Sequence, residues 1–288
     1  MNFPLRFSGQ AILAVTLSCG VSFANVAHAN LRAPLLVRAP PSSTPLKSEG
    51  RFTVLGEVLQ FDCSEHECLV EAHYRIRSAD AVSARMTFVM PSNALAEKAT
   101  AHLGGQALAF RATPLTDAQR AGLRRTEAEA GFGEWVGRDT SASEKFELQL
   151  AQGEFDVPFE SGENDVSIRY VQPLGMQEHD HGYFKKGRFL KTFRYELWPL
   201  NEWVLDGHFT IELRVTAPRL PPGYFQRTLG TVASISCGPP ERGLPESIGV
   251  AQRGDRMAYE VTLGPKFPSH LFCSIGDEDL LPRGQGSR

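Results

Sequence analysis

Apolar and polar residues alternate with a period of two through most of this chain. Residues 70–76 alternate Val, Ala, Tyr and Ile with Glu, His and Arg, and residues 209–216 alternate Phe, Ile, Leu and Val with Thr, Glu and Arg. Successive side chains of a β-strand point to opposite faces of its sheet. Each segment therefore predicts a strand with one buried and one solvated face, which is typical of antiparallel sheets that pack on one side.

Turn signals separate about ten such segments, which is the pattern of a β-sandwich. Gly104–Gly105 lies between two short apolar segments and predicts a two-residue hairpin turn. A helix is expected over residues 117–130, because Thr116 and Gln119 form a capping-box pattern and Gly131 can end the helix. The predicted fold class is an all-β, antiparallel β-sandwich with one short crossover helix.

Two segments give expectations for single residues. Residues 52–57 alternate so that Glu57 lies on the face opposite Phe52. Gly153 separates two expected strands, residues 145–150 and 155–159. In this interpretation Glu57 shares a face with Thr53 and Leu55, and Gly153 marks a break between strands.

The first thirty residues have the pattern of an export signal. Residues 11–24 are apolar, and Ala27 and Ala29 place small side chains where a signal peptidase cleaves. Residues 1–29 are therefore expected to be a signal peptide. The chain would be exported to the periplasm or the extracellular space, where disulfides form. In an alternative interpretation Cys19 is lipidated, and the protein is an envelope lipoprotein.

Composition bounds the rest of the chain. Residues 30–50 are rich in proline and predict a linker, residues 51–276 hold the β-sandwich, and residues 277–288 predict a flexible tail. The formal net charge of -3 argues against nucleic acid as a partner. No later stretch approaches the roughly 20 apolar residues of a spanning helix, so no transmembrane helix is expected in the mature chain.

Four cysteines remain after the expected signal peptide: Cys63, Cys68, Cys237 and Cys273. An even number in an exported chain predicts two disulfides, and three pairings are open. Proximity in the sequence favours Cys63–Cys68 together with Cys237–Cys273. Cys63, His66 and Cys68 could instead hold a metal ion, but the sequence shows no convincing fourth ligand nearby.

Aromatic and basic residues gather in residues 182–203. This mixture is typical of a surface for a protein or glycan partner at the cell envelope or outside the cell, because rings give contact area and cations attract anionic groups. In the alternative interpretation the strand in this segment fills the core with its aromatic residues, while Arg194 and Glu196 face water. The predicted binding residues are Tyr183, Phe184, Lys185, Lys186 and Trp135.

A second candidate is the histidine cluster around Glu178–Asp180, where His179 and His181 are two residues apart. Two imidazoles at this spacing on a strand project to the same side and could ligate zinc in a metal-dependent hydrolase. The sequence has no Gly-x-Ser-x-Gly elbow or phosphate loop. We therefore expect a module for binding or structural interaction without a cofactor, and keep the hydrolase as the alternative.

Four segments carry a family resemblance: Met-Thr-Phe-Val-Met-Pro at 86–91 followed by the Gly104–Gly105 hairpin, the helix start at 118–121, residues 162–174, and the strand at 195–200. In this order they resemble a VIT domain, the vault and inter-alpha-trypsin-inhibitor N-terminal domain. The resemblance covers residues 52–217 and leaves residues 218–276 as a disulfide-tied extension. It implies a β-sandwich with an interaction role and no catalytic residues. The von Willebrand A domain that usually follows a VIT domain would not fit after Ala217.

Overall fold

The computed structural model describes residues 26–27, 35–36, 51–91, 99–114, 116–117, 150–178, 189–218, 233–238 and 250–281. They form strands β1–β18 and two short 3₁₀ helices, η1 (Trp198–Glu202) and η2 (Glu278–Leu280). The all-β prediction is confirmed, and most strand pairs are antiparallel. The helix expected over residues 117–130 lies outside the described residues except for Asp117.

The largest sheet has nine strands in the order β16-β17-β14-β3-β4-β10-β6-β7, with β13 beside β3. Its long strands are β3 (Phe52–Cys63), β4 (Glu67–Ser78), β10 (Gly162–Pro173), β14 (Ile211–Pro218) and β17 (Arg256–Leu263). The short ones are β6 (Thr100–Leu103), β7 (Gln106–Leu108), β13 (Val204–Leu205) and β16 (Ala251–Arg253). Strand β3 pairs antiparallel with β4 but parallel with β13 and β14, so the sheet is mixed.

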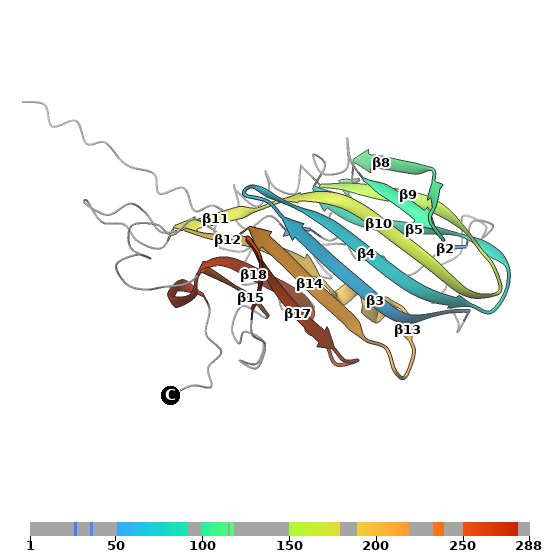
Figure 1. Ribbon diagram of the computed structural model, residues 1–288. Coiled ribbons are helices and arrows are strands. Elements are labelled where there is room, and N and C mark those ends of the chain that lie inside the picture. Colours follow the sequence, from blue (N-terminus) through green and yellow to red (C-terminus); the bar gives the residue numbers. More distant parts are fainter. Residues whose placement is uncertain are drawn as a thin grey trace, which may run out of the picture.

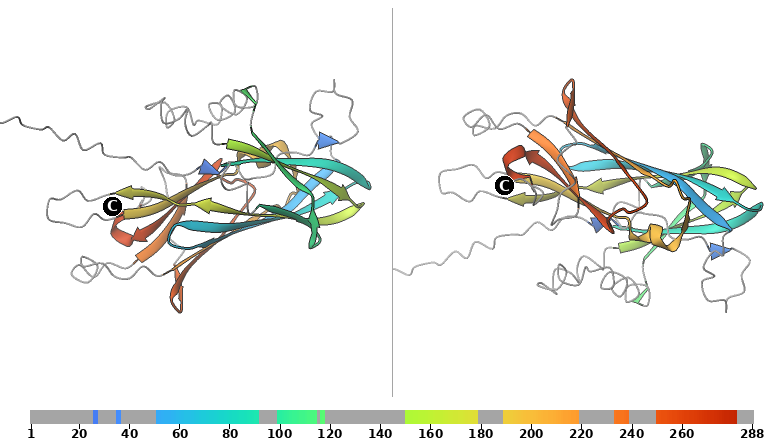
Figure 2. Two further views of the ribbon diagram at one scale, coloured as in Figure 1. Left: turned by 90° about the horizontal axis from the view of Figure 1, so that it is seen from above. Right: turned by 90° about the horizontal axis from the view of Figure 1, so that it is seen from below.

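Two smaller sheets pack on one face of the large sheet (Figures 1 and 2). The first contains β2 (Leu35–Leu36), β5 (Val82–Pro91), β9 (Leu150–Phe159) and β8 (Phe110–Pro114). The second contains β1 (Val26–Ala27), β11 (Gly175–Glu178), β12 (Phe189–Glu196), β18 (His270–Asp277) and β15 (Ala233–Gly238). Ring contacts join the layers: Phe52 lies 4.9 Å from Phe159, and Phe61 lies 4.5 Å from Phe193, between centroids. The result is a sandwich whose second layer consists of two sheets.

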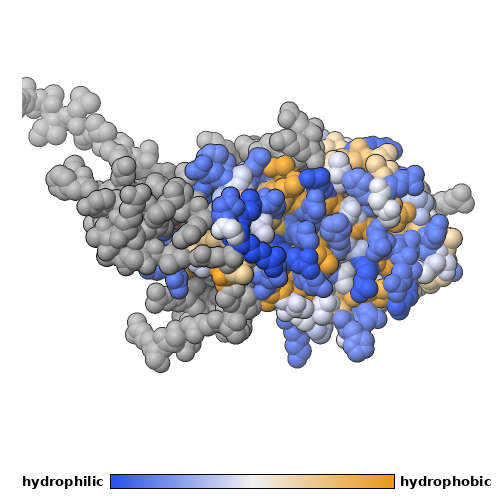
Figure 3. Space-filling model, in the orientation of Figure 1, coloured by the Kyte–Doolittle hydropathy of each residue, from blue (hydrophilic) through white to orange (hydrophobic). Residues whose placement is uncertain are grey.

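The alternation of side chains decides which face of the large sheet is buried. Val70, Ala72, Tyr74 and Ile76 of β4 have at most 1% exposure, as the period of two predicts. The opposite face carries exposed charges over β4 and β10, among them the Arg169–Glu71 and Arg77–Glu163 ion pairs. Figure 3 shows this face, where hydrophilic side chains predominate.

A β-bulge overturns the expectation for Glu57. The register between β3 and β4 shifts between Val54 and Gly56, so the alternation of β3 changes phase there. Glu57 consequently lies on the core side together with Phe52 and Val54, with 2% exposure, and not on the face opposite them. The sequence alone places Glu57 on the wrong face, because the bulge shifts the alternation by one residue and no sequence pattern marks where this happens.

Predictions for two glycine positions have opposite outcomes. Gly104 and Gly105 have φ values of 54° and 84°, so the hairpin turn between β6 and β7 is confirmed. Gly153 was expected between two strands, but β9 runs through it without a break. A methyl group there would lie 2.7 Å from Phe88 and 2.8 Å from Phe110. Gly153 therefore lets two rings pack against the backbone and is not a turn residue.

Both favoured disulfide pairings are confirmed. Cys63–Cys68 closes the turn between β3 and β4, and Cys237–Cys273 joins opposed residues of β15 and β18. The described strands of the expected extension at residues 218–276 belong to the sandwich itself. Strand β17 is part of the large sheet, and β15 and β18 are part of a smaller one. Within the described ranges no helix has the length and apolar character that crossing a membrane requires.

Candidate functional site

The structure positions the ends of the segment that carries the predicted site. Strands β11 and β12 form an antiparallel hairpin whose last pair is Glu178 opposite Phe189. The chain therefore leaves β11 at Glu178 and enters β12 at Phe189, directly opposite. Residues 179–188 connect these two positions. Figure 1 shows the hairpin reaching toward one end of the molecule. The residues themselves lie outside the described part: His179, His181, Tyr183, Phe184, Lys185, Lys186 and, from another segment, Trp135.

The Cys63–Cys68 turn lies beside the base of this hairpin. The backbone N–H of Leu174, between β10 and β11, donates a hydrogen bond to the carbonyl of His66 at 2.8 Å. Within the turn the Ser64 hydroxyl donates to the Glu67 carbonyl at 2.9 Å. Burial lowers the pKa of Lys191 on β12, and the negative charge of Glu65 opposes this shift. The turn therefore places acidic charge close to the first half of β12.

An arginine ties the disulfide-closed hairpin to β17. Arg256 donates hydrogen bonds to the Asp62 carboxylate, to the Cys63 carbonyl at 3.1 Å and to the Thr216 hydroxyl at 3.3 Å. Thr216 in turn donates to Asp62 at 2.9 Å. Three strands of the large sheet are thus joined at the end of the molecule that also carries the β11–β12 hairpin. This arrangement can hold the hairpin on a fixed base.

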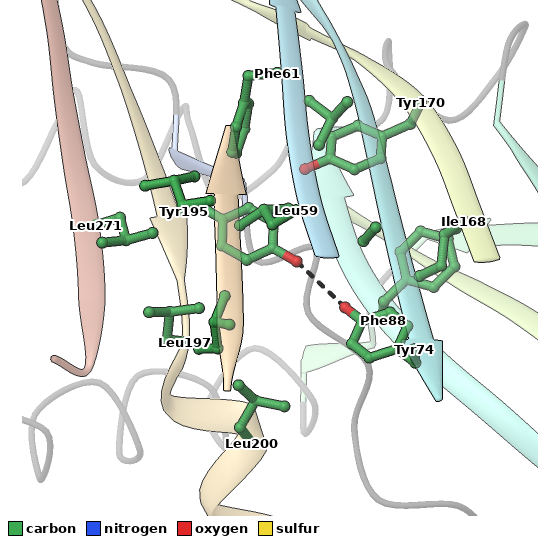
Figure 4. Close-up of a cluster of buried hydrophobic side chains, with 14 of the residues drawn as sticks. Leu59, Phe61, Tyr74, Phe88, Ile168, Tyr170, Tyr195, Leu197, Leu200 and Leu271 are labelled. Carbon is green, nitrogen blue, oxygen red and sulfur yellow. Dashed lines mark hydrogen bonds between the residues drawn. The ribbon is translucent and has the colours of Figure 1, made fainter. Parts of the chain in front are cut away.

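A polar group lies inside the core beneath the second layer. The Tyr195 hydroxyl donates to the Glu57 carboxylate at 3.3 Å and lies 3.3 Å from the Tyr74 hydroxyl (Figure 4). Burial raises the pKa of Tyr195 and of Tyr170 well above the usual value, and the Glu57 charge adds to both shifts. Both hydroxyls therefore stay protonated, and that of Tyr195 donates to the buried carboxylate. Sequence reasoning missed this group, because the bulge before Glu57 hides its orientation.

A second polar group lies on the other face of β12. Glu196 is fully buried, and its carboxylate lies 2.5 Å from the Arg194 guanidinium. Both residues were expected to face water, and for Glu196 this expectation is wrong. Burial, with a smaller effect of Arg194, lowers the pKa of His270 on β18 to about 4. The side-chain amide of Gln172 donates to the Arg194 carbonyl at 3.1 Å, so β10 also contacts this strand.

The aromatic residues of segment 182–203 that the structure describes lie in the core. Phe193, Tyr195, Trp198 and Trp203 are all buried, in agreement with the core interpretation of the strand. They are therefore not available as an exposed platform. In the part of the chain that the structure describes, no three His, Cys, Asp or Glu side chains are grouped to hold a metal ion. The His179 and His181 cluster falls outside that part.

Comparisons with known proteins give distant similarities of fold. No family model matches the chain, and no curated protein sequence matches it, so the VIT resemblance stays an expectation. The chain is similar to the crystal structure of a proposed nutrient binding protein from Legionella pneumophila, with a TM-score of 0.44 and 10% identity over 87% of this chain and 72% of that one. It is also similar to native leukotriene A4 hydrolase from Saccharomyces cerevisiae, with a TM-score of 0.39 and 10% identity over 82% of this chain and 32% of the hydrolase.

Proposed function

We propose that this protein is an exported β-sandwich module that binds a protein or glycan partner at the cell envelope or outside the cell. The observation that carries the proposal is the pairing of Glu178 with Phe189 at the end of the β11–β12 hairpin. This pairing gives residues 179–188 a fixed base at one end of the sandwich. The two disulfides support an oxidising compartment, in which the expected signal peptide would place the chain.

The base of the hairpin is stiff. Phe193 and Tyr195 of β12 are fully buried, and β12 pairs with β18 from Lys191 to Glu196. Strand β18 is in turn joined to β15 by the Cys237–Cys273 disulfide. A loop held by such a base loses less conformational entropy on binding than a free segment does.

The side chains of residues 183–186 indicate the class of partner. Tyr183 and Phe184 can supply flat apolar contact area, and Lys185 and Lys186 add two positive charges. Aromatic rings beside cations suit an anionic glycan or an acidic surface of a protein. The partner is therefore expected to be acidic, and its binding is expected to weaken as salt increases.

Alanine substitution of these four residues tests the proposal. The probes are a glycan fraction and a protein fraction, prepared separately from the envelope of the producing organism and immobilised. Wild-type protein should be retained by one fraction, and the Y183A/F184A/K185A/K186A variant should lose at least tenfold in affinity. The matched control is R253A/K266A, which removes two exposed charges from another part of the surface. The proposal fails if neither fraction retains the wild type, or if the four-residue variant binds as well as the control.

A further inference from the structure

One tyrosine hydroxyl in the core is buried without a protein acceptor. Tyr170 on β10 has no exposed surface, and its hydroxyl makes no hydrogen bond within the part of the chain that the structure describes. Figure 4 shows this hydroxyl pointing into the interior, toward the side on which the Tyr195 and Tyr74 hydroxyls meet. A hydroxyl that leaves water on folding and finds no partner destabilises the folded state. The Tyr170 hydroxyl therefore needs an acceptor inside the sandwich.

A buried carboxylate and further hydroxyls lie close to Tyr170. Burial is the largest cause of the raised pKa of Tyr170, and the negative charge of Glu57 adds to it. Burial likewise dominates the raised pKa of Tyr195, to which Tyr74, Glu57 and Tyr170 each contribute. Electrostatic effects fall with distance, so these groups share one enclosed region between the layers. Tyr195 donates to Glu57 directly, whereas Tyr170 does not reach either of them.

The polar atoms of this region are loosely spaced. The Tyr195 hydroxyl lies 3.3 Å from the Glu57 carboxylate and 3.3 Å from the Tyr74 hydroxyl, whereas bonds between such oxygens are usually about 2.7–2.8 Å long. Ala72 lies on β4 between Tyr74 and the residue opposite Tyr170, and its methyl group is the smallest inward side chain of that strand. Loose polar contacts beside a small side chain indicate that this region can take a small polar molecule.

We infer that one water molecule is bound in the core between Tyr170 and Glu57. It accepts a hydrogen bond from the Tyr170 hydroxyl and donates one to the Glu57 carboxylate. Its second hydrogen is directed to the Tyr195 oxygen, which gives the water about three partners, the usual number for buried water. A metal cation in the same place would leave Tyr170 without an acceptor, because a cation cannot accept a hydrogen bond. The water joins β10 to β3 and β12 across the two layers, and it does not depend on the proposed partner surface.

The sign of one isosteric substitution tests the inference. Y170F keeps the ring but removes the hydroxyl that donates to the water, so the urea midpoint should fall by about 0.5 M with the disulfides intact. A hydroxyl that had no partner at all would give the opposite sign, because its removal relieves a buried unsatisfied group. A crystal structure of the wild type should show a water molecule within hydrogen-bond distance of Oη of Tyr170.

Two controls identify the partner of Tyr170 and the nature of the bound molecule. E57Q should reduce the effect of Y170F but leave that of Y259F unchanged, because Tyr259 donates directly to the Cys237 carbonyl at 3.4 Å. The wild-type midpoint should be the same in sodium, potassium and choline chloride, since water and not a cation is bound. The inference is overturned if Y170F is at least as stable as the wild type, if E57Q does not alter its effect, if the crystal shows no water there, or if stability depends on the monovalent cation.

Discussion

Substitution of Gly153 by alanine should destabilise the sandwich at the contact between β5, β8 and β9. The added methyl carbon would lie 2.7 Å from Cζ of Phe88 and 2.8 Å from Cζ of Phe110. Carbon atoms in favourable contact lie about 3.5–4.0 Å apart, so both rings would have to move by about 1 Å. Phe88 is fully buried and stacks on the partly buried Phe110, with centroids 5.6 Å apart, so the Phe88 ring cannot move freely.

The net cost follows from two opposing effects. Overpacking of a filled core typically costs about 1–3 kcal/mol. Replacing a glycine inside a strand by alanine recovers about 0.5–1 kcal/mol of backbone entropy. The free energy of unfolding should therefore fall by about 1–2 kcal/mol. Urea denaturation with the disulfides intact, followed by tryptophan fluorescence, measures this change as a shift of the midpoint at constant slope.

Two control variants determine whether the rings cause the effect. Gly207 has no atom within 4 Å of the site of an added methyl group, so G207A should change stability by less than about 0.5 kcal/mol. In an F110A background one of the two clashes is absent, so G153A should cost about 1 kcal/mol less than in the wild type. The reasoning is refuted if G153A is as stable as the wild type, or if its cost is the same with and without Phe110.

Three further predictions concern pH, disulfides and the buried hydroxyls. His270 has a pKa of about 4 in the folded chain against an ordinary 6.5, so the unfolded chain binds the proton first as pH falls, and stability is lost between pH 6.5 and 4. Because solvent partly screens this ring, the loss is about 1–2 kcal/mol, and thermal denaturation across this range should show a flatter profile for H270N. Replacing both cysteines of Cys237–Cys273 by alanine should lower the free energy of unfolding by about 4 kcal/mol. The same change at Cys63–Cys68 should lower it by about 2 kcal/mol, because that disulfide closes the shorter loop. Equal losses in urea denaturation would contradict this order. Y195F should cost about 1–3 kcal/mol because it removes a donor from a buried carboxylate. Y74F should cost less in the same assay, because its bond to Tyr195 joins two neutral hydroxyls, and a bond to a charged group is the stronger kind.

The parts of the fold that sequence predicted are those governed by local rules. The period of two in β4 and β14 identified the buried residues, because each strand keeps one face on the core throughout its length. Gly104–Gly105 identified a hairpin, since both residues need positive φ. Proximity identified the disulfides, because Cys63–Cys68 spans a single turn and Cys237–Cys273 spans two strands of one sheet.

The parts that sequence did not predict depend on distant segments. The parallel pairing of β3 with β14 joins residues more than 150 positions apart, and no local pattern reports it. The burial of Glu196 depends on what covers the outer face of β12, which alternation cannot show. The orientation of Glu57 depends on one extra residue in β3. For the candidate site, sequence supplied the candidate residues, and only the register of Glu178 with Phe189 shows which strand ends flank them.

Strand β12 gives the proposed partner site its fixed base. Its inward residues Phe193 and Tyr195 are fixed in the core, and its pairing with β18 continues to Glu196. The hairpin end at Phe189 therefore belongs to a strand whose other end is fixed in the core. Residues 179–188 can consequently be substituted, and partner binding measured, while the buried side chains of β12 keep the sandwich folded.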